Sequence, residues 1–132
     1  MDYDLIIIGA GTSGFPSAKI AAGYGKKILL AGEGAVGGKC IENGCIPAKA
    51  MIYAAKVYKS VLNAEKFGVD IDGAELNFKK VLEYTNKLVR DAINSNENQL
   101  EAIENIDFLK QKGHCISESS VELKKFLNLS RL

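Results

Sequence analysis

Two of the three cysteines in the sequence lie close together, in the stretch GGKCIENGCIPAK at residues 37–49. Cys40 and Cys45 are separated by four residues, and five steps along a regular helix rise about 7.5 Å. A disulfide requires Cα atoms within about 7 Å of each other, so the two thiols can bond only where the backbone bends between them. Asn43 and Gly44 form a turn-favouring dipeptide at that place, which makes such a bond feasible.

The residues next to Cys45 favour a reactive thiol. Pro47 predicts the first turn of a helix, and the positive end of a helix dipole favours the thiolate over the thiol. Lys49 lies one helical turn beyond Cys45 and adds positive charge. A thiolate beside a second cysteine can cycle between dithiol and disulfide. Cys40, Cys45 and Lys49 are therefore candidate catalytic residues of a redox centre.

Two other uses of these cysteines remain open from the residues alone. Zinc could take Cys40, Cys45, His114 and Cys115, although adjacent His and Cys donors are an awkward pair. A purely structural disulfide fits poorly with the reducing environment expected below. We expect no metal site, and we expect Cys115 to be a small buried residue.

A second chemical signal is the glycine pattern G-x-G-x-x-G at Gly9, Gly11 and Gly14, between an apolar run and a helical pattern. The first glycine allows a tight turn, the second allows backbone to approach a pyrophosphate, and the third allows close packing of helix and strand. The helix N-terminus then offers N–H groups to phosphate. A plain turn is the alternative, but the strand before and the helix after favour a dinucleotide site. The candidate cofactor-binding residues here are Gly9, Ala10, Gly11, Thr12, Ser13 and Gly14.

Such a site needs an acidic residue about twenty positions further on, to bind a ribose hydroxyl. Glu33 is the candidate. Its fit is imperfect because Gly32 directly follows the second apolar run. The alternative is an ordinary solvated glutamate in a loop.

These residues need a scaffold, and the patterns predict an α/β protein. The predicted unit is a Rossmann-like βαβ with a parallel sheet whose first strand is buried on both faces, followed by long helices. Thr12 or Ser13 is expected to cap the first helix. The predicted strands are residues 3–8, 26–31, 106–110 and 119–125, with 111–118 between the last two, and the predicted helices are 12–25, 47–67 and 78–103, the last with an interruption near 94–98.

Bulk properties exclude several classes of function. The chain has 132 residues and a net charge of +1, which fits one domain and gives no strong attraction to nucleic acid or to anionic membranes. No apolar run approaches the roughly 18 residues of a membrane span. Asp2 and Asp4 precede the first apolar run, where a secretory signal would carry positive charge. We therefore expect a cytoplasmic protein with neither nucleic-acid nor membrane partners.

The stretch at residues 37–49 resembles the redox-disulfide motif of the flavoprotein disulfide reductases. This pyridine nucleotide-disulfide oxidoreductase family includes dihydrolipoamide dehydrogenase, glutathione reductase and mercuric reductase. Its motif, G-G-x-C-x-x-x-G-C-x-P-x-K, follows an N-terminal G-x-G-x-x-G by about thirty residues, and this sequence has both in order. KGHC and SSVEL also resemble the family's third strand and following loop, so the resemblance covers most of residues 1–125.

The resemblance implies FAD as cofactor, with its pyrophosphate at residues 9–14 and its adenosine ribose at Glu33. Cys40 would attack the substrate disulfide, and Cys45 would lie against the flavin as the charge-transfer thiolate. Lys49 would approach the flavin N5 region. Electrons would pass from NAD(P)H through FAD to the cysteine pair, and then to a small-molecule or protein disulfide. Further cofactor-binding residues implied in this way are Gly38, Lys39, Cys40, Cys45, Lys49, His114 and Cys115.

The sequence also departs from the family pattern. Ala48 stands in place of a common serine, Lys39 in place of a threonine or serine that contacts FAD, and residues 126–132 do not continue the pattern. Family members add an NAD(P)-binding domain and a dimerisation domain with a His-Glu acid/base pair. We expect residues 1–132 to be the N-terminal segment of the FAD-binding domain, incomplete as an enzyme, with a homodimer in the full-length form. The alternative is a non-catalytic FAD- or nucleotide-binding module, or a truncated product that needs a missing partner.

Overall fold

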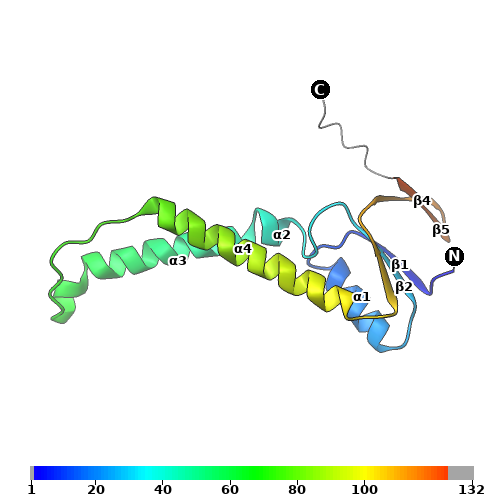
Figure 1. Cartoon of the computed structure of the whole chain (residues 1–132), viewed down its shortest axis with the longest axis horizontal. Helices are drawn as coiled ribbons and strands as arrows, with labels where there is room; N and C mark the ends of the chain where they lie inside the picture. Colours follow the sequence, from blue (N-terminus) through cyan, green and yellow to red (C-terminus); the bar gives the residue numbers. More distant parts are fainter. Residues whose placement is uncertain (1, 125–132) are drawn as a thin grey trace, which may run out of the picture.

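The structure, a computed structural model, describes residues 2–124 and begins with the predicted βαβ unit. Strand β1 (Leu5–Ile8) leads through helix α1 (Gly14–Gly23) to strand β2 (Ile28–Ala31). Strand β3 (Ile106–Leu109) completes a parallel sheet in the order β1-β2-β3 (Figure 1). The predicted α/β class and parallel sheet are confirmed.

The core lies on one face of this sheet. Alternate residues of the strands point to the same face, and there they meet α1 and the last turns of helix α4 (Phe78–Glu101). Ile28 and Leu30 of β2 and Ala18 of α1 are fully buried. The buried cluster comprises Ala10, Phe15, Ala18, Ala22, Ile28, Leu30, Val36, Leu100 and Ile106.

The first strand is not buried on both faces, which corrects the sequence-based expectation. β1 is an edge strand of the described sheet, and Leu5 and Ile8 are 40% and 44% exposed. By contrast, all four residues of β2 are buried, and β2 has a neighbouring strand on each side. An apolar run predicts a central strand, but pairing partners distant in sequence decide where the strand lies.

Two long helices form an arm that extends away from the sheet (Figure 1). Helix α3 (Cys45–Leu62) runs outward, and a short 3-10 helix η1 (Ala64–Phe67) and a loop lead into α4, which returns to the sheet. The Asn77 side chain caps α4 by accepting the Lys80 N–H at 3.0 Å. α4 is continuous for 24 residues, so the expected interruption near residues 94–98 is wrong.

The described chain ends in an antiparallel hairpin of β4 (Lys112–Ser117) and β5 (Ser120–Lys124). The expected connection at residues 111–118 is therefore wrong, because most of it forms β4. The end of the predicted strand, residue 125, and the divergent residues 126–132 lie outside the described residues.

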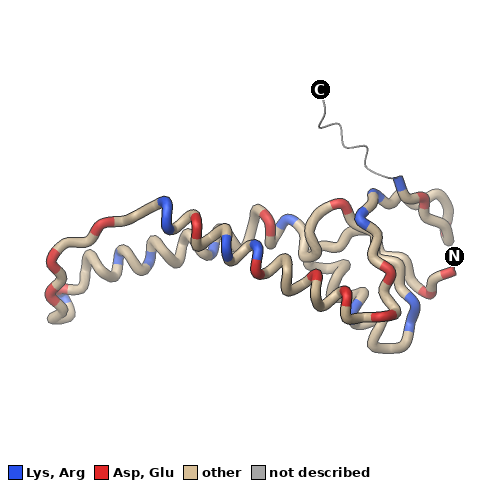
Figure 2. Tube along the Cα trace, viewed as in Figure 1, with Lys and Arg blue, Asp and Glu red and all other residues tan. Residues whose placement is uncertain are grey.

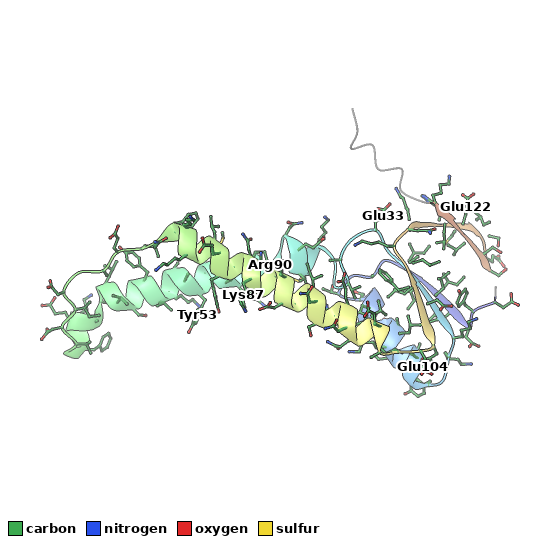
Figure 3. The ribbon with its side chains drawn as sticks, viewed as in Figure 1. Glu33, Tyr53, Lys87, Arg90, Glu104 and Glu122 are labelled. Carbon is green, nitrogen blue, oxygen red and sulfur yellow. A yellow bond between two sulfur atoms is a disulfide. The ribbon has the colours of Figure 1, made fainter. Side chains whose placement is uncertain are left out.

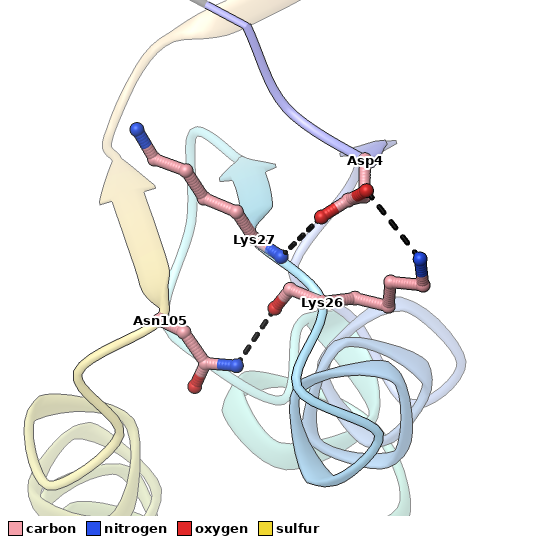
Figure 4. A network of polar contacts seen from close by, with 4 residues as sticks. All are labelled: Asp4, Lys26, Lys27 and Asn105. Atoms are coloured by element: carbon pink, nitrogen blue, oxygen red, sulfur yellow. Dashed lines mark hydrogen bonds and ion pairs between the residues drawn. The ribbon is translucent and has the colours of Figure 1, made fainter.

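A polar network joins the starts of the three parallel strands (Figure 4). The Asp4 carboxylate accepts the Lys27 N–H at 2.8 Å and pairs with the Lys26 ammonium at 3.5 Å. The Asn105 side-chain amide donates to the carbonyls of Lys26 at 2.7 Å and Ala22 at 2.9 Å. These bonds fix the end of α1 and the starts of β1 and β2 relative to β3, and so hold the sheet in register.

The charged residues are spread along both the arm and the sheet end of the molecule, with the two signs interspersed (Figure 2). Such a surface creates no large field of one sign. Within residues 2–124, no helix combines the length and apolar character that a bilayer crossing requires.

Candidate redox and nucleotide site

The two close cysteines form a disulfide with a Cα–Cα distance of 4.8 Å. A four-residue helix α2 (Lys39–Glu42), which the sequence analysis missed, carries Cys40, and α3 begins at Cys45. The chain bends at Asn43 and Gly44 between the two helices. The predicted bend and the helix start beside Cys45 are confirmed, although α3 begins at Cys45 rather than at Pro47.

Close packing favours glycine at residue 44. A Cβ at this position would lie 3.0 Å from the Lys39 carbonyl oxygen and 3.2 Å from the Cα of Cys40. The absence of a side chain therefore allows the two helices to meet closely enough for the disulfide.

The glycine-rich turn between β1 and α1 has the form expected of a phosphate-binding loop. Gly9 has φ +106°, a region that glycine enters without strain. A Cβ on Gly14 would overlap the Gly9 carbonyl oxygen and come within 3.2 Å of Ile7 Cγ2. The turn can therefore exist only with glycine at its third position, as the packing argument predicts.

Ser13 is the N-cap residue of α1, but its side chain makes no capping hydrogen bond. The expectation that the Thr12 or Ser13 side chain caps α1 is therefore wrong. The first turn of α1 also contains no acidic residue. This end of α1 therefore carries no negative side chain of its own, as a site for an anion requires.

The loop at residues 32–38 connects the glycine-rich turn to the disulfide. The Gly37 N–H donates to the Ala10 carbonyl at 2.7 Å, and Gly37 pairs with Gly11 in a parallel bridge. A Cβ on Gly38 would lie 2.9 Å from the Cα of Gly11. Because α2 starts directly after Gly38, the contacts of Gly37 and Gly38 with the turn also fix the start of the helix that carries Cys40.

Glu33 is exposed in this loop, just beyond the carboxyl end of β2. Figure 3 shows Glu33 and Glu104 at opposite ends of the sheet, with Glu33 at the end where β2 leads into the loop. Glu33 is thus placed where a ligand at the glycine-rich turn could extend to it.

A second acidic residue, Glu42, was missed by sequence reasoning. Its carboxylate accepts the Ala35 N–H at 3.4 Å and pairs with Lys39 at 3.5 Å. The Lys39 side chain is 86% exposed, so this ion pair contributes little to stability. The role of Glu42 is local, since it ties the loop to α2. The i,i+3 spacing of Lys39 and Glu42 is the sequence signal for this ion pair.

Lys49 is exposed on α3, one turn after Cys45. With Tyr53 and Asp91 it lines a groove of about 560 Å³ between α3 and α4. Cys45 is exposed and Cys40 is half-buried. Lys49 therefore lies on the same face of α3 as Cys45, and its side chain is accessible to a ligand.

His114 and Cys115 lie on β4, and both are exposed. The expectation that Cys115 is buried is wrong, because the hairpin has little covering it in the described chain. Gly113 packs against Ile8, with a built Cβ 3.1 Å from Ile8 Cγ1, so the hairpin lies beside the end of β1. Residues 2–124 bring together no group of three His, Cys, Asp or Glu side chains that could hold a metal.

The molecule is an α/β protein with a glycine-rich turn between the first strand and the first helix of its parallel sheet. One loop joins this turn to a disulfide at the start of another helix. These features define a protein of the redox-disulfide class. The chain belongs to the pyridine nucleotide-disulphide oxidoreductase family, whose pattern it matches over residues 3–126. The resemblance noted from the motif at residues 37–49 is confirmed.

Similar proteins carry names from within this family. The chain is 42% identical over 80 residues to dihydrolipoyl dehydrogenase of Bacillus subtilis, covering 61% of this chain and 17% of that protein. It is 31% identical over 121 residues to the dihydrolipoyl dehydrogenase of Chlamydia trachomatis, covering 92% and 26%. It is 39% identical over 89 residues to glutathione reductase of a Nostoc species, covering 67% and 19%.

A solved structure shows the same fold. The Cu(II) complex of the HOCl-induced flavoprotein disulfide reductase RclA from Escherichia coli superposes with a TM-score of 0.74 at 24% identity, over 91% of this chain and 24% of that one. The chain thus spans between 17% and 26% of the length of these relatives.

Proposed function

We propose that this chain is the N-terminal, FAD-binding segment of a flavoprotein disulfide reductase of the dihydrolipoamide dehydrogenase type. The observation that carries the proposal is the Cys40–Cys45 disulfide, joined through the loop at residues 32–38 to the glycine-rich turn. In a complete protein of this kind, NAD(P)-binding and dimerisation domains would supply the hydride donor site and the homodimer. The cytoplasm fits its chemistry, since a redox-cycling cysteine pair belongs in a reducing compartment.

The residues at the glycine-rich turn fit a dinucleotide. The backbone at Gly9 and Gly11 leaves open space, since a Cβ on either would meet nothing within 4 Å. The first N–H groups of α1 and the absence of acidic residues there suit the pyrophosphate. Glu33 would accept hydrogen bonds from the ribose. The remaining residues proposed to contact FAD are Ala10, Thr12, Ser13, Gly14, Gly38, Lys39, Cys40, Cys45, Lys49, His114 and Cys115.

FAD would supply the two-electron chemistry that links a nicotinamide donor to the cysteine pair. The disulfide accepts two electrons, its S–S bond breaks, and protons from solvent complete the two thiols. Cys40, as thiolate, attacks a substrate disulfide to form a mixed disulfide and releases one substrate thiol. Cys45 then attacks Cys40 Sγ, releases the second substrate thiol and restores the Cys40–Cys45 bond. The exposed face of Cys45 is where the flavin would pack, which leaves Cys40 to meet the substrate.

Flavin binding tests the proposal. The purified chain, titrated with FAD, should quench the flavin fluorescence with a saturable curve, and dithiothreitol should reduce the bound complex at the cysteines alone. Failure to bind FAD at any concentration up to the millimolar range, with the chain folded, would reject the assignment.

A second candidate is a nucleotide-binding module without redox turnover, because the chain covers only 17% to 26% of its relatives. Such a module would bind FAD or ADP at the same turn. NADH-dependent reduction of lipoamide by residues 1–132 alone is not expected under either candidate, since these residues cover 26% or less of such relatives. Only the redox segment should change the absorbance spectrum of its bound flavin when Cys40 and Cys45 are reduced.

A further inference from the structure

The loop at residues 32–38 is held from two sides by elements distant in sequence. On one side the Ala10 carbonyl accepts the Gly37 N–H at 2.7 Å. On the other side the Asn96 side chain, from α4, donates through Nδ2 to the Val36 carbonyl at 3.0 Å, in a partly buried position. Because adjacent residues of the loop are bonded to different elements, the loop is restrained at this point.

The contact between Asn96 and the loop is close. Gly37 has φ +108°, and a Cβ there would lie 2.7 Å from Asn96 Nδ2 and would also clash with Ile41 Cδ1. The Val36 side chain is fully buried in the core. The Asn96 amide therefore lies directly against the loop backbone, with no room for an intervening group.

Helix α4 serves as a common support for both cysteines. It packs along α3, which begins at Cys45, and it also contacts α2, which carries Cys40. Cys45 is thus positioned by helix packing. Cys40 follows Val36 by four residues, so the Asn96 hydrogen bond restrains the chain that leads directly into it.

We propose that Asn96 is a positioning residue for the Cys40–Cys45 pair, acting through the Val36 carbonyl. This inference rests on the proposed redox function of the pair. In the disulfide state the S–S bond itself holds the two residues together. In the dithiol state no covalent link remains, and the Asn96 bond keeps Cys40 near Cys45. It therefore raises the effective concentration of one thiol beside the other and favours disulfide formation.

The test measures the disulfide equilibrium of the whole chain in glutathione buffers. One glutathione disulfide takes two electrons from the dithiol, so that the Cys40–Cys45 bond forms and two glutathione thiols, carrying the two protons, are released. Asn96→Asp keeps the shape of the side chain but removes the donor. The equilibrium constant for disulfide formation should fall measurably, by more than about twofold and at most about tenfold, since the free energy of one hydrogen bond sets the upper limit.

The matched control is Gln99→Ala, three residues further along α4. Gln99 accepts a hydrogen bond from Lys19 of α1 at 2.6 Å, so its removal weakens helix packing without freeing the loop. It should leave the disulfide equilibrium within about twofold of wild type. A second readout, in flavin-free protein, is hydrogen exchange at the Gly37 amide, which should be about three- to tenfold faster in Asn96→Asp and unchanged in the control.

An unchanged equilibrium in Asn96→Asp would overturn the inference, and so would a shifted equilibrium without faster exchange at Gly37. If Asn96→Asp does not fold, Asn96→Leu removes the donor at similar volume without adding a charge, and the same results are expected. If the wild-type disulfide does not form in any buffer, the proposed redox function fails. Exchange at Gly37 then decides by itself whether Asn96 holds the loop.

Discussion

At the scale of single residues, glycines determine whether the site can form, and they do so for two reasons. Gly9 has a positive φ, whereas a Cβ would overlap backbone on Gly14 and would be tightly confined on Gly44. The sequence pattern predicts the need for glycine at Gly14. It does not reveal that Gly44 is needed for packing, because the backbone of Lys39 and Cys40 reaches that position only in the folded chain.

Gly14→Ala should destabilise the chain and abolish FAD binding. The new Cβ would overlap the Gly9 carbonyl oxygen, and relief of such overpacking costs about 1–3 kcal/mol. Urea unfolding measures the loss. Gly23→Ala, at the end of the same helix, is the control, since a Cβ there meets nothing within 4 Å; it should be neutral or stabilising by up to about 1 kcal/mol. Equal stability of the two variants would contradict the account of the turn.

Asp4 should make the stability of the sheet sensitive to acid. The Lys27 backbone N–H, and then the Lys26 ammonium, hold the pKa of Asp4 below its usual value of 3.8. A carboxyl group with a lowered pKa contributes stability above its unfolded pKa and loses it as the pH falls through the folded pKa. Between pH 7 and pH 2, wild type should therefore lose more stability than Asp4→Asn, by unfolding in urea. An identical pH dependence in Asp4→Asn would show that these bonds do not stabilise the fold. The control is Asp72→Asn in the arm loop, which should keep the pH dependence of wild type.

At the scale of elements, sequence patterns predicted the helices, strands and turns that are determined by residues close together in the chain. The βαβ unit, the helix start at Cys45 and the turn at Asn43 and Gly44 are all encoded within a few residues. Helix α2 was missed because four residues are too short to show a helical period. The pattern reading missed strand β4 because KGHCIS has no alternation of apolar and polar residues. The family resemblance placed the third strand of the sheet at KGHC, but that strand is β3, and KGHC pairs with β5 instead. The Asn96–Val36 bond joins residues 60 apart, which no local pattern can reveal.

Helix α4 connects the arm to the sheet, and its cap should affect both. The Asn77 side chain accepts the Lys80 N–H at 3.0 Å. Asn77→Ala should therefore lower the free energy of unfolding by about 1 kcal/mol, measured by thermal denaturation followed by circular dichroism. Asn94→Ala, an exposed position inside α4, should instead have little effect or stabilise the helix slightly. A larger loss for Asn94→Ala than for Asn77→Ala would contradict this account of α4.

At the scale of the whole molecule, stability is distributed unevenly. β2 is fully buried, whereas at the tip of the arm Phe67 and Val69 are 83% and 53% exposed. Buried strands open only with the whole fold, but exposed segments open locally. Amides of β2 should therefore exchange with solvent at least about 100-fold more slowly than those of residues 66–76. Similar rates in the two regions, by hydrogen exchange, would indicate that the sheet is not the stable core.

The environment of β1 depends on which elements lie beside it. A strand with four apolar residues in a row fits the middle of a parallel sheet, yet it is an edge strand of the described sheet. The pattern of residues 3–8 predicted a strand correctly, but it could not show that β1 pairs with β2 on one side only.

The most direct test of the central claim is the absorbance spectrum of the FAD-loaded chain before and after addition of dithiothreitol. If the Cys40–Cys45 pair adjoins the flavin, reduction should produce a long-wavelength charge-transfer band, which Cys45→Ser should abolish and Cys40→Ser should retain without any reductant. Bound flavin that shows no such band in wild type or in Cys40→Ser would contradict the claim that these two cysteines form a redox centre with the nucleotide.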